Sequence, residues 1–130
     1  MKKMSFLNKL KNQGKIKLVE ASEEIKESYI EKSESNLISS KILFENNQLE
    51  ESISLSYYSM YHILTALLFK TGIKSENHSA SIKLLKDVFD LDNLEIKKAK
   101  KERIDKQYYV DFNITKQETK NSIKYPKAKV

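Results

Sequence analysis

Cysteine and tryptophan are absent from this chain of 130 residues, and turn-forming residues are scarce, with two glycines and one proline. Without thiols, the chain excludes disulfide scaffolds, thiolate zinc sites and cysteine nucleophiles. So few turn formers cannot supply the many tight connections of a β-sandwich or barrel. The chain also lacks any run of about 18 apolar residues, which excludes a membrane-spanning helix. These absences together indicate a helical protein. Because the basic N-terminus lacks the apolar stretch of a signal peptide, we expect the protein in the cytoplasm.

Charge is unevenly spread along a chain whose length has room for one domain with a modest core. The chain has 24 Lys+Arg against 18 Asp+Glu, a net charge of +6. Residues 20–60 hold nine acidic and three basic residues, whereas residues 97–130 hold eleven basic and four acidic ones. The two segments pair with each other, or the basic one binds an anionic partner, or it is a solvated lysine-rich face.

Residues that typically start or end helices divide most of the chain into helical segments. Ser22, followed by Glu23 and Glu24, predicts the start of a helix that runs to Asn46-Asn47. The most apolar stretch, 49–70, follows and is closed by Gly72 as a left-handed cap. Further helices are expected from Asn77 or Ser79 to about 89, from 94 to 109, and from a capping box at Thr115 until Pro126 stops it. No segment requires a strand.

The 49–70 helix carries two apolar stripes, which predicts that it is central and buried on more than one side. The first stripe consists of Ile53, Tyr57, Met60, Leu64 and Leu67, and the second of Leu55, Tyr58, His62, Thr65 and Phe69. The second face is available to another helix or another subunit. Ser52, Ser56 and Ser59 would let a neighbouring backbone approach closely.

Arg103 is the only arginine beside 23 lysines. Lysine cannot replace it where a planar, bidentate and permanently charged group is needed, so it is a candidate functional residue. The alternative is a structural salt bridge to the acids of residues 20–60. Tyr108 and Tyr109 follow on the same lysine-rich helix, which includes Lys100 and Lys106. Aromatic rings beside such a helix can bind single-stranded nucleic acid by stacking and phosphate attraction, unless the tyrosines close the core.

The two histidines, His62 and His78, have no metal-site context. Neither has a glutamate three residues before it, as carboxylate-bridged di-iron bundles require. Zincin, P-loop and nucleophile-elbow motifs are absent too, so we expect no metal and no cofactor. His62 is either a hydrogen-bonded core residue or a catalyst, and His78 is a more exposed capping, turn or binding residue.

Three helices in succession resemble a known family. The residues are Ser56-Tyr57-Tyr58-Ser59-Met60-Tyr61-His62, the later Ala66-Leu67-Leu68 and Gly72, and Asn77-His78-Ser79. They look like the Tyr-Tyr-Ala-Met-Phe-His, Ala-Leu-Leu, Gly and Ser-His pattern of small prokaryotic HEPN-domain proteins. The resemblance covers about residues 15–123 of a single domain. It implies an all-α, up-and-down bundle of four or five helices, usually a homodimer, often encoded beside a partner nucleotidyltransferase.

Some members of that family are metal-independent ribonuclease toxins whose site is an arginine followed four to six residues later by histidine. The family arginine falls on Arg103, but Tyr108 and Tyr109 stand where the histidine would be. General acid–base help then lacks its proton carrier unless the fold brings His62 or His78 close to Arg103. In related toxin–antitoxin pairs the partner modifies a tyrosine near this motif, so Tyr108 or Tyr109 is a candidate acceptor.

Three functions follow from these residues and the resemblance. The first is a module that binds RNA or a nucleotide and acts with a nucleotidyltransferase, in the manner of a toxin–antitoxin pair. The second is a metal-independent ribonuclease with Arg103 at a dimer cleft, and the third is a non-catalytic dimeric interaction protein. The candidate catalytic residues are Arg103, Tyr108 and His62, and the candidate binding residues are His78, Tyr58, Tyr109, Lys100 and Lys106.

Overall fold

The computed structural model describes residues 2–108, with side chains for residues 3–104. Within this range the helices are α1 (Lys2–Asn12), α2 (Glu23–Glu45), α3 (Leu49–Lys70), α4 (His78–Asp87) and α5 (Leu94–Tyr108). Two short strands, β1 (Ile16–Leu18) and β2 (Ile73–Ser75), complete the described elements. The all-α prediction is confirmed, and no helix in the described range is long and apolar enough to cross a membrane.

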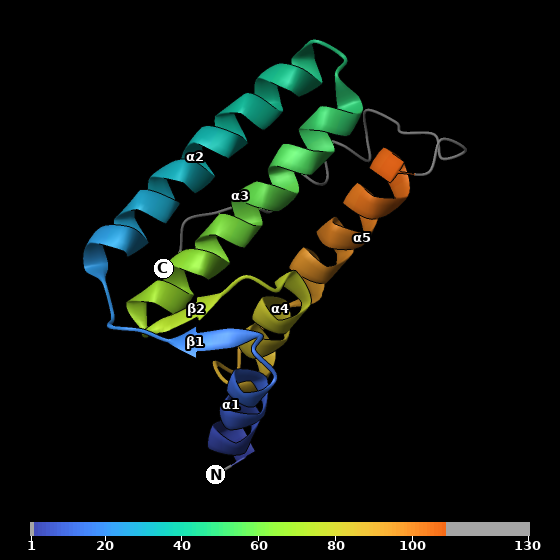
Figure 1. Ribbon diagram of the computed structural model, residues 1–130. Coiled ribbons are helices and arrows are strands. Elements are labelled where there is room, and N and C mark those ends of the chain that lie inside the picture. The colour runs from blue at the N-terminus through green and yellow to red at the C-terminus, as the bar shows by residue number, and fades with distance from the viewer. Residues whose placement is uncertain (1, 109–130) are drawn as a thin grey trace.

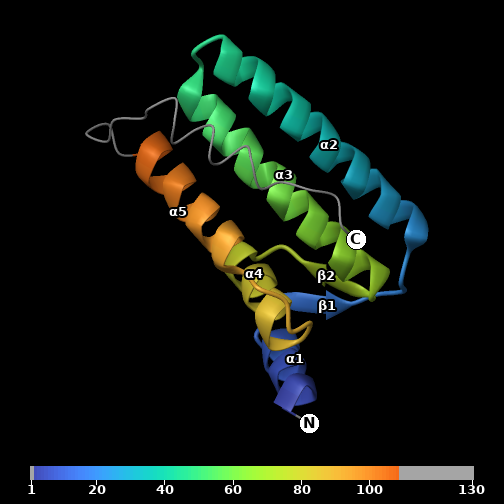
Figure 2. The same cartoon turned by 180° about the vertical axis from the view of Figure 1, so that it is seen from behind.

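The three long helices lie side by side, and α3 runs between α2 and α5 in both views (Figures 1 and 2). Successive long helices run in opposite directions, as expected of an up-and-down bundle. The short helices α1 and α4 gather with the two strands at one end of α3. The prediction that the 49–70 helix is central is therefore correct.

Reciprocal serine pairs hold α2 against α3. Ser33 Oγ donates to the Ser59 carbonyl at 2.7 Å, and Ser59 Oγ donates to the Ser33 carbonyl at 2.8 Å. Two turns further along, Ser40 and Ser52 exchange the same kind of bonds. All four serines are buried. Because serine is small and each hydroxyl finds a carbonyl, the two backbones approach closely without leaving a buried polar group unsatisfied.

The N-terminal end of the chain differs from the sequence-based prediction in two ways. Residues 2–12 form a helix where only a basic segment was expected, and Leu10 from this helix joins the core. The reading without strands was also wrong, because β1 pairs antiparallel with β2 and aligns Lys17 with Lys74. Strands of three residues are too short to show an alternating pattern in the sequence.

The helix boundaries agree closely with the caps in the sequence. Ser22 accepts from the backbone N–H of Ile25, and Asn77, not Ser79, caps α4 by accepting from Ala80. Gly72 has a φ of +83°, as expected of a left-handed residue after a helix. The helix predicted from Thr115 lies outside the described residues.

A candidate phosphate-binding site on helices α3, α4 and α5

Side chains from three helices converge on one half-buried surface. Helix α3 supplies Tyr57 and Tyr58, which are consecutive and therefore point about 100° apart around the helix. Helix α4 supplies His78 as its first residue, since the cap at Asn77 starts the helix there. Helix α5 supplies Arg103 and, one turn earlier, Lys100. We refer to Tyr57, Tyr58, His78, Lys100 and Arg103 as the phosphate site.

His78 is fixed by two tyrosines of α3. Its Nδ1 lies 2.7 Å from the hydroxyl of Tyr57, and its ring stacks on Tyr61 with centroids 3.9 Å apart and planes 11° apart. Tyr61 is held in turn by a 3.0 Å hydrogen bond to Ser81. These contacts set the position and tilt of the imidazole without consuming its second nitrogen, Nε2.

Arg103 lies over the same part of α3. Its guanidinium carbon is 5.1 Å from the ring centroid of Tyr58 and 5.6 Å from that of Tyr57. A guanidinium at such distances gains about 0.5–2 kcal/mol from the ring faces, which position it over α3. The structural alternative in the sequence reading placed Arg103 against the acidic helix, whereas these contacts place it against α3.

Two cations and burial keep His78 neutral. Burial lowers the pKa of His78, and the charges of Lys100 and Arg103 lower that pKa further. Burial also raises the pKa of Tyr57, which therefore keeps its hydroxyl proton. The site thus combines a neutral imidazole with permanent positive charge.

The Tyr57 contact indicates which nitrogen of His78 carries the proton. Tyr57 is 0% exposed, and its hydroxyl lies within hydrogen-bond distance of His78 Nδ1. A buried hydroxyl needs an acceptor for its proton. Tyr57 therefore donates to Nδ1, and the proton of the neutral ring resides on Nε2, which is available to donate to a ligand.

His62 belongs to a neighbouring stack of rings. Asn36 Nδ2 donates to His62 Nδ1 at 3.1 Å, and the ring stacks on Tyr29, which stacks in turn on Phe69. Burial, together with the charge of Lys32 and the proximity of His78, lowers the pKa of His62 to about 4. The Tyr58 ring links this stack to the phosphate site, with its centroid 6.2 Å from the His62 ring and 6.2 Å from the His78 ring.

Comparison with known proteins gives the family. The family model for the HEPN domain matches residues 26–128. The chain belongs to the HEPN-domain family. It is also 43% identical over 58 residues to the UPF0332 protein PH1297 of Pyrococcus horikoshii, a match that covers 45% of this chain and 41% of that protein.

The other predicted residues of this HEPN domain are placed in part. Lys100 Nζ donates to Ser79 Oγ at 2.8 Å, which puts its charge beside His78. Lys106 and Tyr108 lie in the last turns of α5, in the part for which side chains are not described, and Tyr109 lies outside the described residues. The structure thus brings together Arg103, His78, Tyr58 and Lys100 from the predicted set, and places His62 in the adjoining stack.

Sequence reasoning missed the roles of Tyr57 and Tyr61 in this HEPN domain. Tyr57 was assigned to the core stripe, and it is indeed fully buried, yet its hydroxyl reaches His78. A signal was present, because a buried tyrosine needs a partner for its hydroxyl. The sequence could not say which partner, since His78 comes from a different helix.

Proposed function

We propose that this HEPN domain is a binding module for single-stranded RNA, in which Arg103 and His78 hold a backbone phosphate. The observation that carries the proposal is the convergence of a guanidinium and an imidazole on the same two tyrosines, Tyr57 and Tyr58. Arginine binds phosphate oxygens through two parallel N–H bonds, and His78 Nε2–H adds a third donor.

The protonation of His78 supports binding over base catalysis. A general base must present an unprotonated nitrogen to the ribose 2′-hydroxyl. In the arrangement described above, the unprotonated nitrogen is Nδ1, and it is occupied by Tyr57. His78 in this tautomer is a hydrogen-bond donor to phosphate.

The ring stack beside the site supports a single strand as the ligand. Tyr58, His62, Tyr29 and Phe69 are half-buried, and their rings form a partly exposed row that leads away from the phosphate site at Tyr58. Bases of single-stranded RNA stack on such rings, at about 1–3 kcal/mol per base. A duplex offers no free base faces to these side chains.

Fluorescence anisotropy with a labelled oligouridine of about ten nucleotides tests the binding proposal. Arg103→Ala and His78→Ala should each weaken binding at least about tenfold, equivalent to about 1.4 kcal/mol. Lys98→Ala removes one exposed charge from the same helix and should change the affinity less than twofold. Equal losses of affinity in all three variants would mean that RNA is held only by the general positive charge of α5. Undiminished binding by Arg103→Ala would refute the proposed phosphate site.

Metal-independent ribonuclease activity is the second candidate, because the fold supplies an imidazole beside Arg103 although tyrosines follow that arginine in the sequence. The test is incubation of the protein with mixed cellular RNA in the presence of a chelator. Cleavage that disappears in both Arg103→Ala and His78→Ala would make the domain an enzyme. Intact RNA in all three samples would contradict ribonuclease activity and leave RNA binding as the proposed function.

Partner binding and dimer formation complete the proposal. We expect the domain to act with a nucleotidyltransferase, in the manner of a toxin–antitoxin pair, and co-purification with the product of a neighbouring nucleotidyltransferase gene checks this.

We also expect a homodimer, which sedimentation velocity would detect. Ile38 and Ile42, which are 61% and 54% exposed on α2, are the positions for interface variants such as Ile38→Asp.

A further inference from the structure

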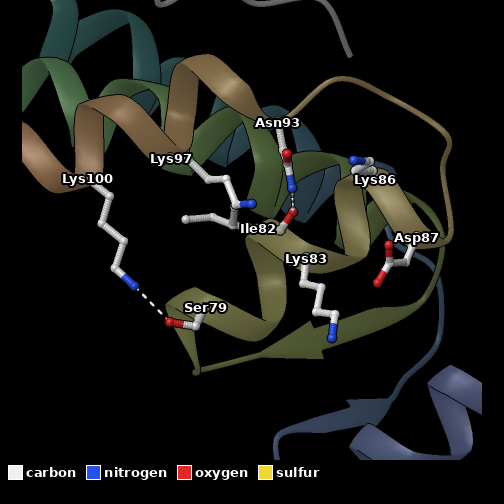
Figure 3. Close-up of a pocket in the computed structure, with 8 residues that line it drawn as sticks. All are labelled: Ser79, Ile82, Lys83, Lys86, Asp87, Asn93, Lys97 and Lys100. Carbon is white, nitrogen blue, oxygen red and sulfur yellow. Dashed lines mark hydrogen bonds between the residues drawn. The ribbon is translucent and has the colours of Figure 1, made fainter.

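A cavity of about 380 Å³ lies between α4 and α5, next to the phosphate site (Figure 3). Its size falls at the lower end of the range of small-ligand cavities, about 300–1,000 Å³. Both helices contribute lysines to its wall: Lys83 and Lys86 from α4, and Lys97 and Lys100 from α5. Asp87 is the one carboxylate in the lining. Four positive charges against one negative charge make this a strongly cationic cavity.

These lysines are not neutralised within the described part of the chain. None of the four takes part in an ion pair there. Lys83 Nζ lies 5.1 Å from the ring centroid of Phe6, and Lys100 Nζ donates to Ser79. Both contacts hold an ammonium group in place and leave its charge intact. Like charges gathered in this way repel one another, and an anion in the cavity would relieve the repulsion.

The wall of the cavity is also fixed by a buried polar contact. Asn93, which is 4% exposed, donates from its side-chain amide to the carbonyl of Ile82 at 2.9 Å. Figure 3 shows this bond joining the start of α5 to α4 at the edge of the cavity. This hydrogen bond therefore fixes the spacing between the two lysine-bearing helices.

Lys100 connects the cavity to the phosphate site. Its ammonium group donates to Ser79, the residue that follows His78, and its charge contributes to the environment of His78. Arg103 lies one turn further along α5. A ligand with one phosphate at Arg103 can thus place a neighbouring phosphate in the lysine cavity.

We infer that this cavity binds a phosphate monoester, either the terminal phosphate of an RNA strand or the phosphate of a mononucleotide. A monoester carries about 1.5 to 2 negative charges at pH 7, against one on an internal phosphodiester, so it matches the excess of lysines better. The inference rests on the proposed function, because it extends the same strand beyond Arg103. It assigns this module a preference for phosphorylated RNA ends.

The experiment compares three labelled oligouridines of equal length, carrying a 5′-phosphate, a 3′-phosphate or hydroxyls at both ends. The protein should bind one phosphorylated strand at least about fivefold more tightly than the hydroxyl-ended strand. Lys86→Gln with Lys97→Gln should abolish this difference. Lys98→Gln with Lys101→Gln is the matched control, because both residues are exposed on α5 outside the cavity lining, and it should preserve the difference.

A titration with uridine monophosphate separates the two sources of the monoester. Binding of the mononucleotide that depends on Lys86 and Lys97, without any preference among RNA ends, would assign the cavity to a free nucleotide. If neither ligand responds to these two lysines, the inference is overturned. Binding of the hydroxyl-ended strand and its dependence on Arg103 report separately on the proposed function, so the two failures are distinguishable.

Discussion

At the residue scale, the hydroxyl of Tyr57 selects which ring nitrogen of His78 carries the proton, while burial and the charges of Lys100 and Arg103 lower the pKa of this histidine. Because this hydroxyl donates to Nδ1, it stabilises the neutral imidazole. Tyr57→Phe should therefore raise the pKa of His78, which NMR titration of the ring proton can measure. Tyr61→Phe is the matched control, since its ring also contacts His78 but its hydroxyl bonds to Ser81. A lower pKa in Tyr57→Phe would mean that Nδ1 carries the proton, and would restore His78 as a candidate base.

His62 gives the stability of the protein a dependence on acid pH. Its pKa of about 4 in the folded protein lies below the value of about 6.5 for an unfolded chain, so the unfolded state binds more protons between these values. The free energy of unfolding should thus fall as the pH drops from 7 to 4. Allowing for partial exposure of the ring, we expect a loss on the order of 2 kcal/mol.

Urea denaturation at a series of pH values measures this loss. His78 also has a lowered pKa and contributes in the same direction, so the comparison must be between the parent protein and His62→Gln. The variant should show a shallower decline of stability between pH 7 and pH 4. Identical pH profiles would show that the imidazole of His62 is not the titrating group.

The two glycines form a matched pair for a backbone test. Both have positive φ, +71° at Gly14 and +83° at Gly72. A Cβ at Gly72 would lie 2.7 Å from the carbonyl oxygen of Val19, whereas a Cβ at Gly14 would meet nothing within 4 Å. Gly14→Ala should cost about 1 kcal/mol from backbone strain alone, and Gly72→Ala clearly more. Thermal denaturation of both variants checks the order, which equal losses would contradict.

At the element scale, the serine pairs determine how closely α2 and α3 approach. Ser33 is 2% exposed and bonded to Ser59, whereas Ser35 is exposed on the same helix. Ser33→Leu should destabilise the protein by about 1–3 kcal/mol, because a larger side chain cannot enter the contact without moving the helices. Ser35→Leu should stay within about 0.5 kcal/mol of the parent. Similar denaturation midpoints would place the close contact elsewhere.

The elements also show how far the sequence could predict this molecule. Helices α2 to α4 were predictable because Ser22, Gly72 and Asn77 mark their ends with local chemistry. The strands were not, because three residues leave no pattern, and their pairing joins positions 16 and 75. Arg103 was identifiable from the sequence alone because it is the only arginine. The lysine cavity was not, because it depends on the packing of α4 beside α5.

At the scale of the whole molecule, α3 separates an acidic helix from a basic one. Helix α2 carries six acidic and three basic residues, and α5 carries six basic and three acidic ones. Helix α3 lies between these two helices in both views (Figures 1 and 2). Lys97, Lys98 and Lys101 of α5 are exposed, and such a group of exposed cations attracts anions from solution.

This arrangement predicts a defined dependence of RNA binding on salt. Each phosphate contact with a single strand contributes about −0.7 to the slope of the logarithm of affinity against the logarithm of salt concentration. Two contacts, at Arg103 and in the lysine cavity, should give about −1.4 for an end-phosphorylated strand. Lys86→Gln with Lys97→Gln should reduce the slope by about 0.7, and Arg103→Ala should reduce it by a similar amount. A slope near zero in the parent protein would show that RNA is held by ring stacking alone, since stacking releases no counterions.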